Sequence, residues 1–200
     1  MNRQASKSYY DFRLRRQMRS YYEARTNKHI SNVIRLFKRL VDNLPIFIQN
    51  SDKLTHKPYY DIENHDYTKF SDELYEPYVY LTWKKKCEKE GIDYSYPSGM
   101  SSEIIIATEK HITMEPHHPE YYDSEFGGIN SFNRDEVIFT VDATTMPNRY
   151  IMEMVADCKA VGDEMGNSVR SWFDKQIGNR WKFNKKQIYL IYKCIDILEP

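Results

Sequence analysis

The stretch NRYIMEMVADCKAVGDEM, residues 148–165, decides the class of fold. Its apolar side chains recur at spacings of three and four residues, which places them on one face of an α-helix. Pro147 stands just before the stretch, where the start of a helix tolerates proline, and Gly166 follows it as a typical helix end. We therefore predict a helix over residues 148–165. Its apolar stripe consists of Tyr150, Ile151, Met154, Val155, Cys158 and Val161.

Similar periodicity predicts further helices along the chain. Residues 116–148 form the longest stretch without it, and an irregular loop of this length in a compact domain is often functional. Within this loop, residues 137–141 resemble a single strand, although no partner strand is obvious. Since 200 residues suffice for one well-packed core, we predict a single, mainly α domain. The predicted helical segments are 27–44, about 59–70, a helix that follows Ser71, 103–113 and about 184–198.

Composition narrows the class of protein. The chain has 29 basic and 29 acidic residues, which argues against a molecule-wide attraction to nucleic acid but leaves local patches open. Its three cysteines are far apart and form no CxxC pair, so neither a disulfide framework nor a cysteine-based zinc site is indicated. No apolar run resembles a membrane span or a signal peptide. We expect a soluble, cytoplasmic protein with no membrane partner.

The first 26 residues differ from the rest of the chain in charge. Eight basic residues stand against two acids over residues 1–28, and five aromatic side chains are interleaved with them. Such a segment can bind nucleic acid or an acidic partner. It can equally be a solvated helix whose tyrosines rest on the core, and we favour this interpretation because clustered charges usually mark a solvated face. We divide the chain into an N-terminal arm, residues 1–26, and a helical domain, residues 27–200.

His65 and Asp66 carry the clearest chemical signal. Adjacent His and Asp side chains can face one divalent metal ion, and such an ion makes a nucleophile from water at neutral pH. His29 lies at the edge of an apolar helix stripe. Asp157 lies beside the stripe of residues 148–165, where a carboxylate needs a cation, a donor or a metal. The alternatives are a solvent-facing His65 near a helix start and a surface Asp157 paired with Lys or Arg.

A second group of histidines is clustered in the sequence. Three of the six histidines, His111, His117 and His118, fall within eight positions. Neutral imidazole is a common metal ligand and a proton carrier near pH 7, although a surface loop is the alternative interpretation. Lys69 follows Asp66 by three residues, so on a helix it can hold a phosphate near Asp66 or simply pair with it. Glycine-rich phosphate loops and serine or cysteine nucleophile motifs are absent from the sequence.

The order of His29, the His65-Asp66 pair and Asp157 resembles the HD-domain superfamily of metal-dependent phosphohydrolases. Three segments, HDYTKF (65–70), HHPEY (117–121) and MPNRYIMEMVADCKA (146–160), are more specifically similar to an uncharacterised HD-like family of bacteria, phages and large DNA viruses. Three linked motifs in order are a specific signal, whereas each alone is weak. The resemblance covers about residues 27–198. Cys158 departs from the pattern, which often has Trp there.

The resemblance implies an HD-like helical bundle around a divalent transition metal. A mixed set of nitrogen and oxygen ligands suits Mn, Fe, Co, Ni or Zn. His111, together with His117 or His118, is implied to bind a second metal or a phosphate. The implied metal ligands are His29, His65, Asp66, His117 and Asp157.

We therefore expect hydrolysis of a nucleotide or another small phosphorylated substrate. His111 or His118 would stabilise charge or protonate the leaving group, and Lys69 would hold a phosphate oxygen. Glu153 or Glu73 would orient a ligand histidine. The alternative is a non-catalytic interaction protein on an HD-like scaffold, associated with a virion or with nucleic acid through residues 1–26.

Overall fold

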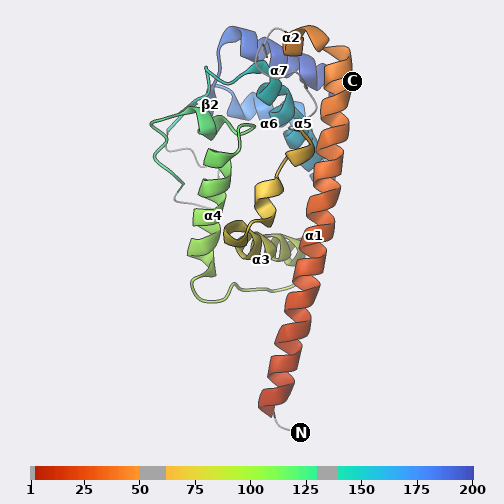
Figure 1. The fold of residues 1–200 in the computed structure, drawn as a ribbon, viewed down its shortest axis with the longest axis vertical. Helices are drawn as coiled ribbons and strands as arrows, with labels where there is room; N and C mark the ends of the chain where they lie inside the picture. Colours follow the sequence, from red (N-terminus) through yellow and green to blue (C-terminus); the bar gives the residue numbers. More distant parts are fainter. Residues whose placement is uncertain (1–2, 50–61, 130–138) are drawn as a thin grey trace.

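One long helix, α1 (Arg3–Asn43), runs along one side of the molecule (Figure 1). The computed structural model describes residues 3–49, 62–129 and 139–200. Over these ranges the chain is mainly helical and forms one domain, as the sequence predicts. The other helices are α2 (Pro45–Gln49), α3 (Asp72–Lys89), α4 (Met100–Met114), α5 (Asn148–Met165), α6 (Val169–Gln176) and α7 (Lys185–Leu198); the 3-10 turns are η1 (Ile62–Asn64), η2 (Tyr67–Phe70) and η3 (Pro119–Tyr122), and the strands are β1 (Val141–Asp142) and β2 (Trp181–Lys182).

Two hydrophobic clusters pack against different parts of α1. The larger cluster joins the C-terminal half of α1, including Phe37 and Leu40, to α5, α6 and α7. The smaller cluster joins Met18 and Tyr22, which lie earlier on α1, to α3 and α4. His29 lies on the stretch of α1 between the two clusters. The side chains at this level of the helix are therefore placed at the seam between the two cores.

The strongest sequence patterns predict their helices correctly. The helix predicted over residues 148–165 is α5, and Gly166 ends it in the left-handed conformation with φ 71°. α7 begins after Asn184, whose side chain accepts hydrogen bonds from the backbone of Lys186 and Gln187. α4 ends at Met114, two residues before Pro116, but it begins at Met100, earlier than the predicted start at residue 103.

Two local predictions are wrong. Residues 62–70 form the two short turns η1 and η2 instead of a continuous helix, and Tyr59 lies outside the described residues. The strand predicted over residues 137–141 does have a partner: Val141 pairs with Trp181 in a two-stranded parallel ladder. Val137 and Ile138 lie outside the described residues. α6 and β2 fall in a segment for which the sequence predicts no regular structure.

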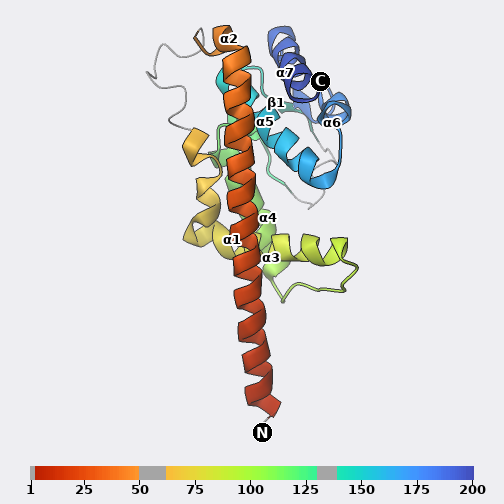
Figure 2. The ribbon, with the colours of Figure 1, turned by 90° about the vertical axis from the view of Figure 1, so that its right-hand side faces the viewer.

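The N-terminal arm is part of α1. The helix passes without interruption through residues 26 and 27, and its first turns extend beyond α3 into solvent (Figure 2). Residues 11–17 are exposed, whereas Met18 and Tyr22 are buried against α3. Within the described ranges, none of the helices has both the length and the apolar character needed to cross a membrane.

Candidate metal centre

The His65-Asp66 pair lies between η1 and η2, on a segment enclosed by α1, α4 and α5 (Figure 1). His65 is 2% exposed and Asp66 is fully buried, so the interpretation of His65 as solvent-facing is wrong. Asp66 has φ 59° and ψ 11°, the left-handed region that Asp tolerates better than most residues. It is the one non-glycine residue with positive φ in the described part of the chain. A strained backbone of this kind is often found at functional sites.

One oxygen of Asp66 faces a first group of ligand atoms. Oδ2 lies 3.5 Å from Nε2 of His29 and 3.7 Å from Nε2 of His65. Asp157, one turn after Glu153 on α5, completes the group: its Oδ1 lies 3.0 Å from Nε2 of His29 and 4.0 Å from Nε2 of His65. Asp157 is therefore not a surface acid paired with Lys or Arg. Three separate segments, α1, the η1–η2 turn and α5, contribute to this group.

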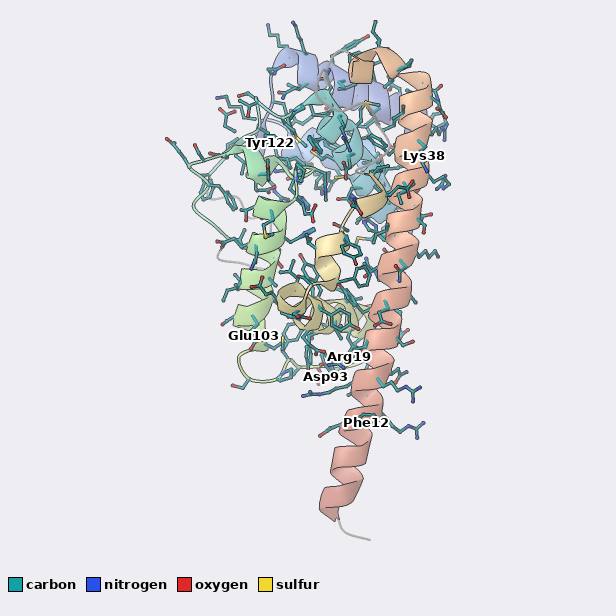
Figure 3. All side chains as sticks on the ribbon, viewed as in Figure 1. Phe12, Arg19, Lys38, Asp93, Glu103 and Tyr122 are labelled. Atoms are coloured by element: carbon teal, nitrogen blue, oxygen red, sulfur yellow. The ribbon has the colours of Figure 1, made fainter. Side chains whose placement is uncertain are left out.

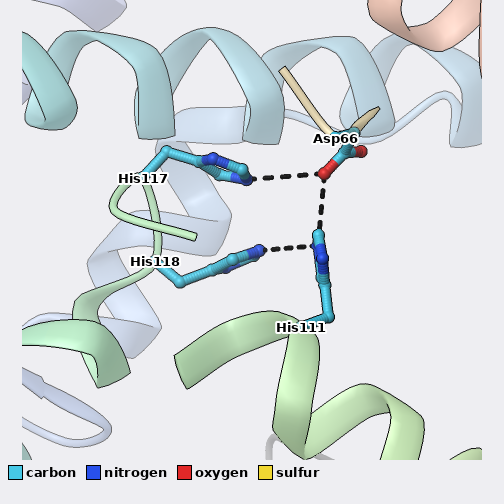
Figure 4. Close-up of side chains that lie close together, drawn as sticks. All are labelled: Asp66, His111, His117 and His118. Carbon is cyan, nitrogen blue, oxygen red and sulfur yellow. Dashed lines mark hydrogen bonds and ion pairs between the residues drawn. The ribbon is translucent and has the colours of Figure 1, made fainter. Parts of the chain in front are cut away.

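The other oxygen of Asp66 faces a second group (Figure 4). Oδ1 lies 3.1 Å from Nε2 of His111 and 3.6 Å from Nε2 of His117, and Nε2 of His118 lies 3.1 Å from Nε2 of His111. His111 is on α4, and the other two histidines lie on the turn that follows it. His117 is 1% exposed, so the surface-loop interpretation is wrong for this residue. The structure brings both His117 and His118 to the same group, where the sequence leaves the choice open.

The two groups fit divalent metal ions. Nitrogen and oxygen ligands about 2.0–2.2 Å from one ion lie about 3–4 Å from each other, which matches the separations in both groups. Among the described residues, the buried Nε2 atoms of His65 and His117 have no hydrogen-bond partner, although each faces Asp66. A buried polar atom without a partner is costly, and a metal ion would remove this cost. Asp66 would contribute one carboxylate oxygen to each group.

Glu153 supports the first group from behind. Its Oε1 lies 2.9 Å from Nδ1 of His65, and both side chains are buried. A proton on Nδ1 donated to this carboxylate leaves the lone pair of Nε2 directed at the metal position. The role predicted for Glu153, orienting a ligand histidine, would act through this contact. Glu73, the alternative from sequence, lies on the surface and pairs with Lys110, so it does not contribute.

A buried ion pair holds the turn that carries His117 and His118. Glu120, in η3, accepts hydrogen bonds from the guanidinium of Arg180 at 3.0 Å and from Nε1 of Trp181 at 3.3 Å. Trp181 belongs to β2, which pairs with β1 at the end of the irregular segment. The short parallel ladder is thereby connected to η3, the turn that directly follows the two histidines.

Opposite charges control protonation in the first group. Burial opposes protonation of His29, but hydrogen bonds to Asp157 and Asp66 outweigh it and raise the pKa of His29 to about 9. Burial also opposes ionisation of Asp66, yet Lys69 and then His65 hold the pKa of Asp66 well below its ordinary value. Asp66 and Asp157 are thus carboxylates at neutral pH, as metal ligands must be.

Two histidines of the second group, His111 and His117, are neutral. Burial, followed by the positive charge of Lys69, lowers the pKa of His111 to about 4. Burial and then His65 hold the pKa of His117 well below its ordinary value. Neutral imidazole is the form that binds a metal, so these two residues can bind one without losing a proton.

A family comparison covers nearly the whole chain. The model described as a family of unknown function (DUF5662) matches residues 18–197. The chain belongs to the DUF5662 family. The matched region of this DUF5662 chain contains both ligand groups and begins within α1 at Met18, the first buried residue after the exposed residues 11–17. The chain matches no curated protein and no solved structure.

A cavity of about 500 Å³ opens from the ligand groups of this DUF5662 chain. His29, Asp66, Asp157, His111 and His118 line its inner end. The rest of the lining contains one acid, Glu88, several threonine and aliphatic side chains, and a set of cationic and tyrosine side chains. That set is Arg25, Lys69, Lys84, Lys85, Tyr22, Tyr78 and Tyr96. A cavity beside a metal centre with this lining can accept an anionic molecule that carries a flat ring.

Two residues of this DUF5662 site are missing from the sequence prediction. The hydroxyl of Thr68 donates to Glu115 and lies 3.4 Å from Nδ1 of His111. The pair can therefore hold the ring of His111 in the orientation that directs Nε2 at Asp66. Glu115 directly precedes Pro116, at the edge of the histidine cluster. This position is the one signal in the sequence that could have identified Glu115 as a residue of the site.

Proposed function

We propose that this DUF5662 protein is a metal-dependent phosphohydrolase that acts on a nucleotide or a small phosphoester. The observation that carries the proposal is the position of Asp66, whose two oxygens face separate groups of ligands at the inner end of a cation-lined cavity. The arrangement is compatible with an HD-like bundle, in which a His, a His-Asp pair and a distal Asp surround the metal. The family itself has no known function, so the proposal depends on the chemistry of the site.

The first ion would be held by one group of ligands and a second ion by the other, with Asp66 common to both. Mixed nitrogen and carboxylate ligands suit Mn, Fe, Co, Ni or Zn. When bound, such an ion lowers the pKa of water to about 7 and polarises a phosphoryl oxygen. The first group is His29, His65, Asp66 and Asp157. The second ion would be held by Asp66, His111 and His117, with His118 beside them to carry a proton.

Side chains at the cavity wall provide the remaining functions. Hydrolysis breaks the bond between phosphorus and the ester oxygen, transfers the oxygen of water to phosphorus and gives the leaving oxygen a proton. His118 is partly exposed and lines the cavity, whereas Nε2 of His111 is directed at Asp66, so His118 is the better placed of the two to supply this proton. Lys69 contacts Asp66 and lines the cavity, where its ammonium can hold a phosphoryl oxygen.

Elemental analysis of the purified protein tests the proposal. We expect one or two equivalents of a transition metal in the wild type. Asp66→Asn should lose all of the metal, and Asp157→Asn should lose at most one equivalent. Asp163→Asn is the matched control, because Asp163 lies on the same helix at the surface and pairs with Lys159. The loaded protein should then release phosphate from one member of a panel of nucleotides and phosphoesters, and Asp66→Asn should not.

Two results would contradict the proposal. The first is a wild-type protein without metal after reconstitution with Mn, Fe, Co, Ni and Zn. The second is full hydrolytic activity in Asp66→Asn. Circular dichroism of each variant shows whether a loss of metal reflects the site or the fold.

The second candidate function is an interaction protein that acts through residues 1–26. The exposure of the first turns of α1, which carry Arg15 and Arg16, favours it. Figure 3 shows Phe12 on the part of α1 that extends below the rest of the molecule, and its side chain is 66% exposed. This function does not exclude the first, because the arm and the metal centre are at different places on α1.

A further inference from the structure

We infer that Glu153 is a positioning residue for both ligand groups, because its carboxylate lies behind His117 of the second group as well as behind His65 of the first. The inference rests on the proposed function, since it concerns the two metal positions proposed there. It goes beyond that function by connecting the two positions through a side chain that is itself no ligand.

His65 and His117 lie where the two groups meet. Their ring centroids are 4.3 Å apart, and their planes are inclined by 44°. Both side chains are buried. His65 lies between η1 and η2, whereas His117 lies on the turn after α4, so the contact joins segments that are distant in sequence. In this packing, the orientation of one ring constrains the orientation of the other.

A closed set of contacts connects these two rings to two carboxylates. On one side, Nε2 of His65 lies 3.7 Å from Oδ2 of Asp66, and Nε2 of His117 lies 3.6 Å from Oδ1 of the same side chain (Figure 4). On the other side, Oε1 of Glu153 lies 2.9 Å from Nδ1 of His65 and 3.5 Å from Nδ1 of His117. Asp66 therefore faces both metal-binding nitrogens, and Glu153 faces both nitrogens behind them.

The position of Glu153 on α5 explains why it is not a ligand itself. Glu153 precedes Asp157 by four residues, so the two carboxylates lie on one face of the helix, about 6 Å apart along its axis. Asp157 lines the cavity and belongs to the first group. Glu153 is 4% exposed and lies outside the cavity lining, so it acts on the metal positions through the two histidines.

Nδ1 of His117 is the atom through which Glu153 reaches the second group. This atom is buried and makes no hydrogen bond within the described residues. Two acids approach it, Glu153 through Oε1 at 3.5 Å and Glu115 through Oε2 at 4.0 Å. Glu153 is the nearer, and Glu115 already accepts a hydrogen bond from Thr68. A small movement of the ring would bring Nδ1 of His117 within hydrogen-bonding distance of Glu153.

A proton on Nδ1 of His117 is the arrangement that this geometry favours. The alternative proton position, Nε2, faces Oδ1 of Asp66, which Nε2 of His111 already approaches at 3.1 Å. A proton on Nδ1 leaves the lone pair of Nε2 directed at the metal position, as in His65. One carboxylate would thus fix the same tautomer in a histidine of each group.

The ring nitrogens of His117 in the metal-free protein test the inference. Burial keeps the pKa of His117 low, so its neutral ring carries one proton, and nitrogen NMR shows which atom holds it. We expect Nδ1–H in the wild type and a shift toward Nε2–H in Glu153→Gln; His117→Gln identifies the signals. Glu115→Gln, which changes the rival acceptor, and Glu164→Gln, an exposed acid on the same helix, should both retain Nδ1–H.

Metal affinity gives a second measurement on the loaded protein. Loss of a carboxylate behind a ligand histidine typically weakens metal binding by about 10–100-fold. In Glu153→Gln we therefore expect every bound equivalent to be weakened to about this extent, as measured by competition with a chelator. Glu164→Gln should retain wild-type affinity for every equivalent.

The outcomes separate this inference from the proposed function. Four results would overturn it: Nε2–H in wild-type His117, Nδ1–H that persists in Glu153→Gln, an equal shift in Glu115→Gln, or a metal equivalent that keeps wild-type affinity in Glu153→Gln. Each is compatible with a phosphohydrolase in which Glu153 orients His65 alone. Conversely, a shift of His117 confined to Glu153→Gln, in a protein that hydrolyses no phosphoester, would support the shared role and contradict the phosphohydrolase.

Discussion

Nδ1 of His65 lies 2.9 Å from Oε1 of Glu153, with both side chains shielded from water. The carboxylate fixes the tautomer of His65 that leaves Nε2 able to bind a metal. We therefore expect Glu153→Gln to weaken metal binding by about 10–100-fold, because an amide can donate to Nδ1 and favour the wrong tautomer. Competition with a chelator measures the change. Glu164→Gln, an exposed glutamate on the same helix, should retain wild-type affinity, and equal affinities in the two variants would contradict the role of Glu153.

Metal binding should release a proton from His29. In the metal-free protein the pKa of His29 is about 9, so this imidazole is protonated at pH 7 and must lose its proton to become a ligand. Affinity should rise by up to about tenfold per pH unit below pH 9 and level off above it. Chelator competition at several pH values checks this, and His29→Gln should lose the slope.

The raised pKa of His29 also affects the stability of the metal-free protein. This contribution to stability decreases as the pH rises, whereas metal affinity increases. Because the folded pKa of about 9 exceeds the ordinary 6.5, protonated His29 stabilises the fold fully below pH 6.5. This contribution is lost as the pH rises through 9. Urea unfolding of the metal-free wild type and His29→Gln across this range should show a difference that shrinks with pH.

Glu120→Gln should destabilise the turn that carries His117 and His118. The charge of Glu120 pairs with Arg180 in the protein interior, and weakening a hydrogen bond to a charged group costs about 1.5–3 kcal/mol of unfolding free energy. Glu63→Gln is the control, since Glu63 pairs with Lys38 at the surface, where a salt bridge contributes less than about 1 kcal/mol. Chemical denaturation measures the unfolding free energy of both variants. Similar losses in the two would show that the buried pair contributes no more to stability than the surface pair.

Charge reversal tests the arm better than truncation. Removing residues 1–25 would delete Met18 and Tyr22 from the smaller hydrophobic cluster, so a loss of binding could reflect unfolding. Arg15→Glu/Arg16→Glu keeps these contacts. If the arm binds nucleic acid, this variant should lose affinity and show a shallower dependence on salt, with unchanged metal content. Arg35→Glu/Arg39→Glu, on the exposed side of the same helix, is the control, and identical binding by both variants would argue against the arm.

The sequence predicts the parts of the structure that depend on local pattern. The amphipathic helix of residues 148–165 and the end of α4 before Pro116 follow from side-chain spacing alone. The conformation of Asp66 does not, because its left-handed backbone is held by contacts with residues distant in sequence. The pairing of Val141 with Trp181 joins segments 40 residues apart, so no local pattern could reveal it.

The same distinction applies to the candidate site. Motif order is enough to nominate His29, His65, Asp66 and Asp157 for one group, and the structure places them together. The sequence cannot decide between His117 and His118, because only the turn between α4 and η3 shows that both face inward. Thr68 lies within the HDYTKF segment and Glu115 lies outside all three segments, and the role of both emerges only from their contact with each other and with His111.

The seam between the two hydrophobic clusters has a consequence for how the protein unfolds. Apart from α1, the two clusters draw on different helices, while Asp66 is common to a group that includes Asp157 on α5 and a group that includes His111 on α4. Without an ion, we expect the part built on α3 and α4 to open independently of the part built on α5 and α7, and hydrogen exchange would show two levels of protection. With ions bound, the two parts become one cooperative unit, so a chain that has lost its metal is exposed to proteolysis long before it is globally unfolded.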